Sequence, residues 1–491
     1  MITLKNVSFS YEGEERKSLN NINLSIKKGE FIVLCGKSGC GKTSITRLLN
    51  GLIPHYYDGK LEGETLLDNN SISQLPLYDI AREVGSVFQN PKSQFFNQDV
   101  FSELAFICEN LGMTKREIHQ RVTKSISSFS ISHLLERDVS QLSGGEKQRI
   151  ACASVSAPNP NIYLFDEPSS NLDVQGIALL RNTMANLKKQ GKTIVVAEHR
   201  LHYLMDLADK IILMVDGKIE KSYTREDFLN LPPITRNSMG LRCARLQELL
   251  PYKSEEKPVF QKHIAFKGFC YMHKSAKKHS LHMNPFYIPK GSVTAIIGEN
   301  GAGKSTFAKC LCGIYKKCGL MEIEGKDENW KARRSTCYMV MQDVNHQLFT
   351  ESVLDEVLLS MDQEEEVLAK KVLKSLDLEH LSHRHPISLS GGQKQRAAIA
   401  TAVVSNREVI IFDEPTSGLD FTHMKEVSKQ LRELSKTGKT IMVITHDPEL
   451  ILDCCNYIIK IGGGGVKESY PLHQNREKLL HYFIEGGVSV E

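Results

Sequence analysis

Two glycine-rich segments have the residue types and spacing of loops that bind phosphate. Each is GxxxxGK followed by Thr or Ser, at residues 36–43 and again at 298–305. Glycines let backbone N–H groups curl around phosphate oxygens, and a following helix N-terminus adds partial positive charge. Lys42 and Lys304 would reach the β- and γ-phosphates, while the hydroxyls of Thr43 and Ser305 would serve Mg²⁺. The residues expected to hold the nucleotide phosphates are Gly36, Lys37, Ser38, Gly39, Cys40, Gly41, Lys42, Thr43 and Ser44, and Gly298, Glu299, Asn300, Gly301, Ala302, Gly303, Lys304, Ser305 and Thr306.

Paired carboxylates follow two other apolar runs. NIYLF ends in Asp166-Glu167, and EVIIF ends in Asp413-Glu414. Acidic residues at the carboxyl end of a parallel strand lie where α/β sheets bind ligands. The aspartates are expected to hold Mg²⁺ through its water shell, and the glutamates to orient and deprotonate the attacking water.

The elements that position these residues are repeated along the chain. An apolar, strand-like run precedes each phosphate loop (FIVLC and VTAII), and a helical run follows it (ITRLLNGL and FAKCLCGI). The loop lysines lie 262 positions apart, whereas the serines of the two LSGG motifs, the aspartates and the histidines His199 and His446 all lie 247 apart. The chain is therefore a duplicated domain of about 230 residues, too long a period for a solenoid.

The repeat predicts an α/β fold with two tandem P-loop domains. We place the first domain at 1–228, a linker rich in Pro, Gly and charge at 229–258, and the second domain at 259–491. Helices are expected around Ile118, Val122 and Ile126 and around Leu368, Val372 and Leu376, because these residues recur at i, i+4 and i+8. Gly462–Gly465 lacks the Lys-Ser/Thr of a phosphate loop and is predicted to be a hairpin turn.

Composition excludes several classes of protein. Lys and Arg number 62 against 58 Asp and Glu, so bulk charge gives no reason to expect nucleic-acid binding. No run approaches the 18 or more apolar residues of a membrane helix, and the N-terminus shows no secretory signal. The 12 cysteines form no CxxC pair and indicate reduced packing residues. Cys310 with Cys312, and the cluster His380, His383 and His385, are weak candidates for metal binding.

Taken together, the motifs resemble the nucleotide-binding domains of ATP-binding-cassette (ABC) proteins. The first half carries GKSGCGKT, LSGGEKQR, LFDEP and Glu198-His199, and the second carries GENGAGKST, LSGGQKQR, IFDEP and Thr445-His446. The resemblance implies, in each half, a RecA-like core, an antiparallel β-subdomain and a helical signature subdomain. It also implies ATP hydrolysis with Mg²⁺, with Glu167, His199, Glu414 and His446 as the catalytic residues.

In that family two cassettes face head to tail, and each ATP lies between the P-loop of one and the SGG of the other. The resemblance thus implies that the two cassettes pair within this chain. One site would join Lys42, Thr43, Gln89, Asp166, Glu167 and His199 to Ser390, Gly391 and Gly392, and the other would join Lys304, Ser305, Gln342, Asp413, Glu414 and His446 to Ser143, Gly144 and Gly145. The Mg²⁺ ligands it implies are Thr43, Gln89 and Asp166, and Ser305, Gln342 and Asp413.

Two tyrosines resemble the family's adenine-stacking residue. Tyr11 precedes its P-loop by 25 positions and Tyr271 precedes its own by 27. The alternative is that they are ordinary strand tyrosines with no contact to adenine, and this alternative has more weight for Tyr271. The first half has SNLD at 170–173 where the second has SGLD at 417–420, and Gln342 is followed by Asp-Val where Gln89 is followed by Asn-Pro. These differences could make the two sites unequal in rate.

FQNPKSQFF at residues 88–96, with IPHYYDGKLEGE upstream, resembles the ATPase subunits of energy-coupling-factor importers of vitamins, vitamin precursors or metal ions. That resemblance implies an integral membrane coupling subunit, a separate substrate-capturing membrane subunit, and a peripheral location on the cytoplasmic face of the cell membrane. Phe95, Phe96, Leu348 and Phe349 could form a groove for a partner helix, or could be buried within the helical subdomain. The alternatives are a soluble tandem cassette acting on ribosomes or DNA, and the ATPase of another ABC importer or exporter.

Overall fold

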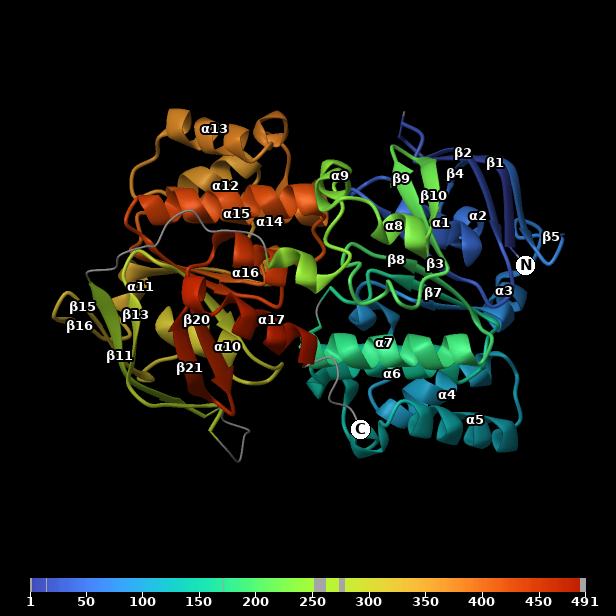
Figure 1. Ribbon diagram of the computed structural model, residues 1–491, viewed down its shortest axis with the longest axis horizontal. Coiled ribbons are helices and arrows are strands. Elements are labelled where there is room, and N and C mark those ends of the chain that lie inside the picture. Colours follow the sequence, from blue (N-terminus) through green and yellow to red (C-terminus); the bar gives the residue numbers. More distant parts are fainter. Residues whose placement is uncertain (1, 15, 171, 251–261, 273–278, 486–491) are drawn as a thin grey trace. The chain divides into compact units, whose positions relative to one another are not determined.

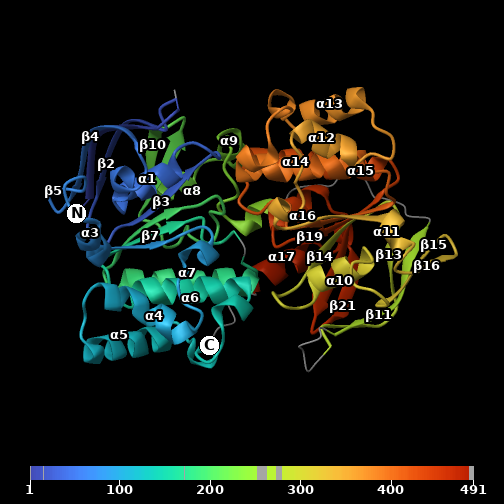
Figure 2. The ribbon, with the colours of Figure 1, turned by 180° about the vertical axis from the view of Figure 1, so that it is seen from behind.

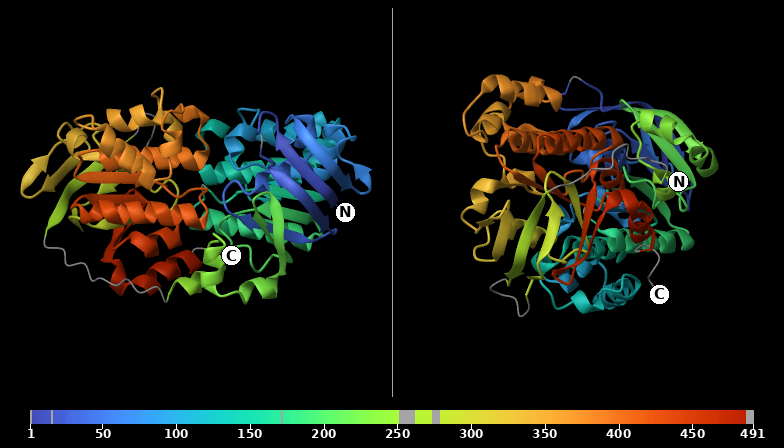
Figure 3. Two further views of the ribbon diagram at one scale, coloured as in Figure 1. Left: turned by 90° about the horizontal axis from the view of Figure 1, so that it is seen from above. Right: turned by 60° about the vertical axis from the view of Figure 1, so that its left-hand side comes forward.

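The computed structural model describes residues 2–14, 16–170, 172–250, 262–272 and 279–485. The described part of the chain divides into two compact units, residues up to 248 and residues 249–485 (Figure 1). Each unit is described by itself below, and Figures 2 and 3 show the same elements from other directions.

The core sheet of the first unit carries the predicted site residues at its strand ends. Its order is β10-β9-β3-β8-β7-β6, with neighbours parallel except for β10, which pairs with β9 antiparallel. The strands are β3 Phe31–Gly36, β6 Val84–Val87, β7 Ile162–Asp166, β8 Thr193–Ala197, β9 Lys210–Val215 and β10 Lys218–Thr224. Strands β3 and β8 are buried along their whole length, which explains their unbroken apolar sequences.

An antiparallel sheet, in the order β2-β1-β4-β5, packs beside this core. Its strands are β1 Ile2–Tyr11, β2 Leu19–Ile26, β4 Gly59–Leu67 and β5 Asn70–Ser71. One buried cluster joins the inner face of this sheet to helix α1, Lys42–Leu49, and to β3. The helix of the phosphate loop is thus fixed between two sheets. The short helices α2 Leu52–His55 and α3 Leu77–Glu83 complete this side.

The other face of the core sheet is covered by longer helices. They are α4 Val100–Asn110, α5 Lys115–Ser128, α6 Gly144–Ser156 and α7 Val174–Lys189. In Figures 1 and 2, α6 and α7 lie side by side along the sheet, with α4 and α5 outside them. The predicted periodic helix is confirmed: Val122 is buried, and Ile118 and Ile126 pack against the same cluster.

The second unit repeats this plan. Its core sheet has the order β17-β18-β19-β14-β20-β21, and its antiparallel sheet is built on β11. The strands are β11 His263–Tyr271, β12 Leu281–Met283, β13 Phe286–Pro289, β14 Val293–Ile297, β15 Gly319–Ile323, β16 Lys326–Glu328, β17 Cys337–Val340, β18 Val409–Asp413, β19 Thr440–Ile444, β20 Tyr457–Gly462 and β21 Gly465–Pro471. The helices are α10 Lys304–Leu311, α11 Arg333–Thr336, α12 Val353–Leu359, α13 Glu366–Ser375, α14 Gly391–Val404, α15 Phe421–Lys436, α16 Pro448–Cys454 and α17 Arg476–Glu485. Gly462 pairs with Gly465 at the end of the β20–β21 ladder, which confirms the predicted hairpin turn.

The first part of the expected linker is folded onto the first unit. Helices α8 Arg225–Leu229 and α9 Pro233–Ser238 follow β10, and Leu241 and Ala244 are buried in the cluster that contains β3 and α7. Arg236, only 1% exposed, donates to the carbonyl of Phe228 and pairs with Glu248 at 2.6 Å. The Pro, Gly and charged residues that suggested a linker therefore make a capped helix and a buried ion pair. Residues 251–258 of the expected linker lie outside the described residues.

The fold is the predicted α/β architecture with a P-loop core repeated in tandem. Within the described part of the chain, no helix is both long and apolar enough to span a membrane.

Candidate functional site

Both phosphate loops have backbone conformations that glycine alone tolerates. Gly36 and Gly298 have φ of 146° and 147°, and Gly41 and Gly303, at the N-caps of α1 and α10, have φ of 101° and 103°. A Cβ added at Gly36 would lie 2.3 Å from the carbonyl oxygen of Met214. The glycines thus let strand, loop and helix turn sharply, as a phosphate loop must.

The loop lysines point back into their own loops. Lys42 Nζ donates to the carbonyls of Gly36 and Lys37, both at 3.1 Å. Lys304 Nζ donates to those of Gly298 and Glu299, at 2.6 and 2.8 Å. The two lysines are 4% and 7% exposed, so each ammonium group is held inside the curl of backbone that would receive phosphate oxygens.

A carboxylate and a hydroxyl meet beside the first loop. Thr43 Oγ1 donates to Asp166 Oδ1 at 3.2 Å. Burial raises the pKa of Asp166 to about 6, with a further contribution from the charge of Glu167. Burial likewise raises the pKa of Asp413, and a hydrogen bond from Ser305 opposes that shift. A buried carboxylate with a hydroxyl neighbour is a donor set that suits Mg²⁺, because a divalent cation would stabilise its ionised form.

The glutamates that follow the strand-end aspartates have unusual backbone geometry in both units. Glu167 and Glu414 have φ of 44° and 52°, a left-handed conformation that non-glycine residues rarely adopt. In each case the N–H donates to the carbonyl of the neighbouring strand, Ala197 at 2.8 Å and Ile444 at 2.9 Å. Each glutamate is thereby turned out of its strand by the sheet itself.

Side chains from several strands converge on Glu167. Gln89 Nε2 donates to Glu167 Oε2 at 2.7 Å, and His199 Nε2 lies 3.3 Å from Glu167 Oε1. His199 Nε2 also lies 3.4 Å from Lys42 Nζ. In the second unit His446 Nε2 lies 3.6 Å from Glu414 Oε1. The structure thus brings Lys42, Gln89, Glu167 and His199 into one group, an arrangement that could position a water molecule against a bound phosphate.

The LSGG serines cap the helices that follow them. Ser143 Oγ accepts from the N–H of Glu146, and Glu146 accepts in return from the N–H of Ser143, a capping box at the start of α6. Ser390 and Gln393 form the same box on α14. Gly144 and Gly145, and Gly391 and Gly392, form the first turns of these helices. A Cβ at Gly391 would meet nothing within 4 Å, so packing does not require glycine there. The absence of a side chain instead leaves the N–H groups of the first turn accessible to an anion.

The two candidate adenine-stacking tyrosines are held differently. The Tyr11 hydroxyl accepts from Arg47 at 2.8 Å and lies 3.1 Å from Ser44 Oγ. The Tyr271 ring stacks on Tyr315, with centroids 4.3 Å apart and planes 4° from parallel. Sequence reasoning missed Arg47 and Tyr315. Arg47 lies four residues after Thr43 on α1, so helical spacing alone could have placed it on the nucleotide side.

Two buried acids fasten the histidine loops, a role that the sequence motifs did not assign to them. Glu198, 2% exposed, accepts from Ser169 Oγ and from the Tyr203 hydroxyl, both at 2.9 Å. Asp447, 1% exposed, accepts from Thr416 Oγ1 at 2.9 Å. In each unit the acid ties the loop after the glutamate to the loop after the histidine. The acid precedes the histidine in the first unit, as Glu198, and follows it in the second, as Asp447, so aligning the two repeats does not reveal the correspondence.

The four residues of the expected groove differ in exposure: two are exposed, one is partly buried and one is buried. Phe96 is 74% exposed and Phe349 is 72% exposed, whereas Leu348 is 4% exposed and Phe95 packs against the core. Glu103 accepts from the N–H of Phe96, and Glu356 accepts from that of Phe349, so both loops are pinned in the same way. Each loop therefore presents a single outward phenylalanine.

The weaker candidates for metal binding gain no support from geometry. Within the described residues, no group of three or more His, Cys, Asp or Glu side chains gathers as metal ligands would. His385 Nδ1 instead accepts from the N–H of Ile387, at the start of a 3₁₀ turn.

Known proteins share this architecture and much of this sequence. The family model described as ABC transporter matches residues 19–170 and 281–417. An ABC transporter ATP-binding protein of Treponema denticola is 43% identical over 472 residues, which are 95% of this chain and 96% of that protein. A second from the same organism is 39% identical, covering 99% of both, and one from Streptococcus mutans is 32% identical, covering 95% and 90%. Archaeal ABCE1, solved in a ribosome-bound complex with Pelota, matches with a TM-score of 0.70 over 97% of this chain and 80% of that one. At 23% identity, that match shows a likeness of fold.

Proposed function

The chain belongs to the ABC transporter family of ATP-binding proteins, with a cassette in each half, and on that premise we propose that it is the ATP-hydrolysing subunit of an energy-coupling-factor importer. Its cassettes bind and hydrolyse ATP. The observation that carries ATP hydrolysis is that both cassettes hold a phosphate-loop lysine, a strand-end Asp-Glu and a histidine in similar geometry. The importer assignment rests on the resemblance of residues 88–96, and of the segment upstream of them, to the ATPase subunits of that class. The cargo we assign is a vitamin, a vitamin precursor or a metal ion.

Hydrolysis takes place, in this proposal, at composite sites where the P-loop of one cassette meets the SGG turn of the other. Lys42 and Lys304 bind the β- and γ-phosphates, and Tyr11 and Tyr271 stack on adenine. The first-turn N–H groups of α6 and α14 complete the opposite cassette's site. Glu167 and Glu414 take the proton of the attacking water, and His199 and His446 orient the γ-phosphate.

Mg²⁺ is the metal we propose for both sites. Thr43, Gln89 and Asp166 would hold it in one, and Ser305, Gln342 and Asp413 in the other. The ion would supply charge neutralisation to the phosphates. The raised pKa of Asp166, about 6, supports the assignment. A buried carboxylate is costly to ionise, and a bound divalent cation would stabilise its ionised form.

The partners we propose are an integral membrane coupling subunit, which the cassettes would drive from the cytoplasmic face of the membrane, and a separate membrane subunit that captures the substrate. The outward rings of Phe96 and Phe349 support this, since exposed aromatic anchors suit a helix-in-groove contact. The Phe96 ring is supported by stacking on Phe106, with centroids 4.8 Å apart, whereas Phe95 packs against the core and Leu348 is buried.

Co-purification tests the partner assignment. Tagged full-length chain is recovered from detergent-solubilised membranes of its own organism, and the proposal expects integral membrane proteins with it. The variant Phe96→Asp with Phe349→Asp should lose them while keeping ATP binding, since both rings are mostly exposed and the Phe96 change removes only its stacking on Phe106. Phe101→Asp, at a ring that is 41% exposed on α4, is the matched control. Recovery of ribosomes without membrane protein would contradict the proposal.

A further inference from the structure

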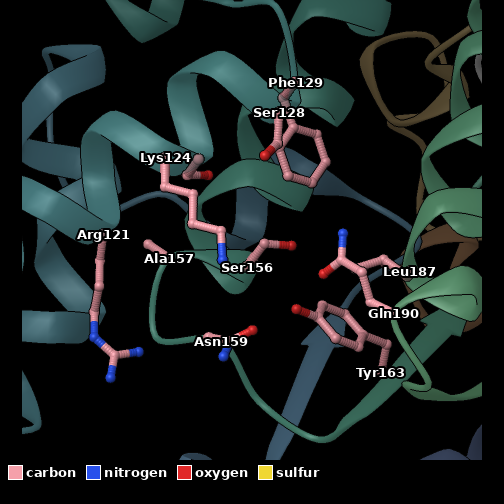
Figure 4. Close-up of a pocket in the computed structure, with 11 residues that line it drawn as sticks. Arg121, Lys124, Ser128, Phe129, Ser156, Ala157, Asn159, Tyr163, Leu187 and Gln190 are labelled. Atoms are coloured by element: carbon pink, nitrogen blue, oxygen red, sulfur yellow. The ribbon is translucent and has the colours of Figure 1, made fainter. Parts of the chain in front are cut away.

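The first unit contains a cavity that its ATP motifs do not use. It lies between α5, the end of α6, the start of β7 and the end of α7, and its volume is about 190 Å³ (Figure 4). A second hollow of about 300 Å³ adjoins it and shares Ser128, Phe129, Leu187 and Gln190. Tyr163 lines the cavity near the start of β7, whereas Asp166 ends that strand. The cavity is thus at the opposite edge of the sheet from the phosphate loop.

The lining of this cavity is positively charged. Arg121 and Lys124 belong to the first hollow and Lys189 to the second, and no lining residue of either is acidic. The guanidinium of Arg121 is fixed by donating to the carbonyl of Pro158 at 2.6 Å. Just outside, the pKa of Lys192 is lowered, by burial first and then by the positive charge of Lys124. Cations crowded in this way favour an anion between them.

Neutral donors complete the lining. Figure 4 shows the Lys124 side chain reaching from α5 toward Ser156, with the Tyr163 hydroxyl and the Gln190 amide directed at the same space. Tyr163 is 2% exposed, and burial raises its pKa to about 12, so its hydroxyl remains a proton donor at neutral pH. Phe129 and Leu187 add an apolar wall.

The second cassette does not repeat this chemistry. The two units keep the 247-residue offset here, as the left-handed residues Ser130 and Asp377 show, with φ of 51° and 54°. At that offset Arg121, Ser156 and Tyr163 are replaced by Leu368, Val403 and Ile410, whereas a lysine is kept at the position of Lys124. Because the ATP motifs occur in both halves and these residues in one, the cavity serves something other than the shared nucleotide chemistry.

We propose that this cavity is a binding site for a small organic phosphate. A volume of about 190 Å³ exceeds the roughly 150 Å³ of a cavity that holds a benzene-sized molecule, so it has room for a phosphate group with a short carbon body. Arg121 and Lys124 bind the phosphate oxygens, the Tyr163 and Ser156 hydroxyls donate to the same group, and the carbon body lies against Phe129 and Leu187. The site is independent of the transport assignment, since it rests on residues of the first cassette alone.

The test uses the full chain with its ATP sites already filled, so that the probe cannot bind there. The parent is the Glu167→Gln, Glu414→Gln variant in saturating Mg·ATP, and the probe is glycerol 3-phosphate, titrated by isothermal calorimetry against glycerol as the neutral control. We expect millimolar or tighter binding of the phosphate and none of glycerol. Lys124→Gln should weaken binding about tenfold or more, the usual loss for a charge-assisted contact.

Matched variants separate a site from a charged surface. Lys371→Gln, the equivalent position in the second cassette, should leave the affinity unchanged. Tyr163→Phe keeps the ring and should weaken binding several-fold with ATP binding intact. The proposal would be overturned if the parent did not bind glycerol 3-phosphate, or if Lys124→Gln and Tyr163→Phe both bound it with the affinity of the parent. Binding of phosphatidylglycerol vesicles that Lys124→Gln abolishes, without binding of glycerol 3-phosphate, would make the ligand a lipid headgroup and would also overturn it.

Discussion

The two cassettes carry the same motifs but anchor them with different neighbours. In the first, the Tyr11 hydroxyl is fixed by Arg47 and Ser44, and His199 lies 3.3 Å from Glu167. In the second, Tyr271 is held by ring stacking on Tyr315, and His446 lies 3.6 Å from Glu414. The segment after α9 also packs on the first phosphate loop, because Gly240 lies against the side chain of Lys37. The two cassettes thus share the groups that would touch ATP but differ in the residues that hold these groups in place. We therefore expect the two sites to have similar chemistry and unequal ATP affinity.

The largest expected effect is the loss of turnover when the glutamates are neutralised. Glu167→Gln with Glu414→Gln should lower steady-state ATPase activity by about 100- to 10,000-fold, because a positioned general base is removed, while ATP binding remains. Each single variant reports the share of turnover carried by the other cassette. The measurement is phosphate release by the full chain, with ATP affinity as the control. Turnover near the wild-type rate in the double variant would refute the role of both residues.

The next largest expected effect is on the affinity for ATP. Lys42→Ala and Lys304→Ala should each weaken ATP binding at one loop by about 10- to 150-fold, since a charge-assisted contact is worth roughly 1.5–3 kcal/mol. A fluorescent ATP analogue measures both affinities in the full chain. Lys5→Ala, which removes an exposed lysine of the same unit, is the control for charge. Undiminished ATPase activity in the Lys42→Ala, Lys304→Ala double variant would contradict the assignment.

A smaller effect should be confined to the first cassette. Gly240 has φ of +78°, and an added Cβ would lie 2.7 Å from the Cγ and Cε atoms of Lys37. Gly240→Ala therefore displaces the side chain of Lys37, the residue whose carbonyl accepts from Lys42 at 3.1 Å. We expect ATP affinity at the first loop to fall several-fold, and unfolding to become easier by about 1–2 kcal/mol from the left-handed alanine. Affinity is measured in the Lys304→Ala background.

The control for Gly240 lies in the same unit. Gly191 has φ of +74° and nothing within 4 Å of an added Cβ. Gly191→Ala therefore introduces the same strain of a left-handed alanine without touching the phosphate loop, and its ATP affinity should stay at the parent value. Equal affinities in the two variants would show that the segment after α9 does not support the site.

How far the sequence predicts this molecule depends on whether a residue acts locally or through a distant partner. The tandem P-loop fold was predictable, because unbroken apolar runs such as Phe31–Cys35 must form buried strands and each phosphate loop follows one. The expected linker was harder, because Pro and Gly end helices as often as they mark loops, and the buried pair of Arg236 with Glu248 depends on tertiary packing. Tyr315 could not be linked to Tyr271 because its position depends on the register of β11 with β15.

The smallest expected effect separates the two tyrosines. Tyr11→Phe removes the acceptor for Arg47, so the arginine and Ser44 must find new partners and the ring loses its anchor, at a cost of about 1–3 kcal/mol. Tyr271→Phe keeps the stacked pair with Tyr315 almost unchanged, because the ring and its quadrupole remain. ATP affinity, measured for Tyr11→Phe in the Lys304→Ala background and for Tyr271→Phe in the Lys42→Ala background, should fall several-fold in the first and stay within about twofold in the second. The opposite order would mean that the hydroxyl of Tyr271, rather than its stacking on Tyr315, supports the second adenine site.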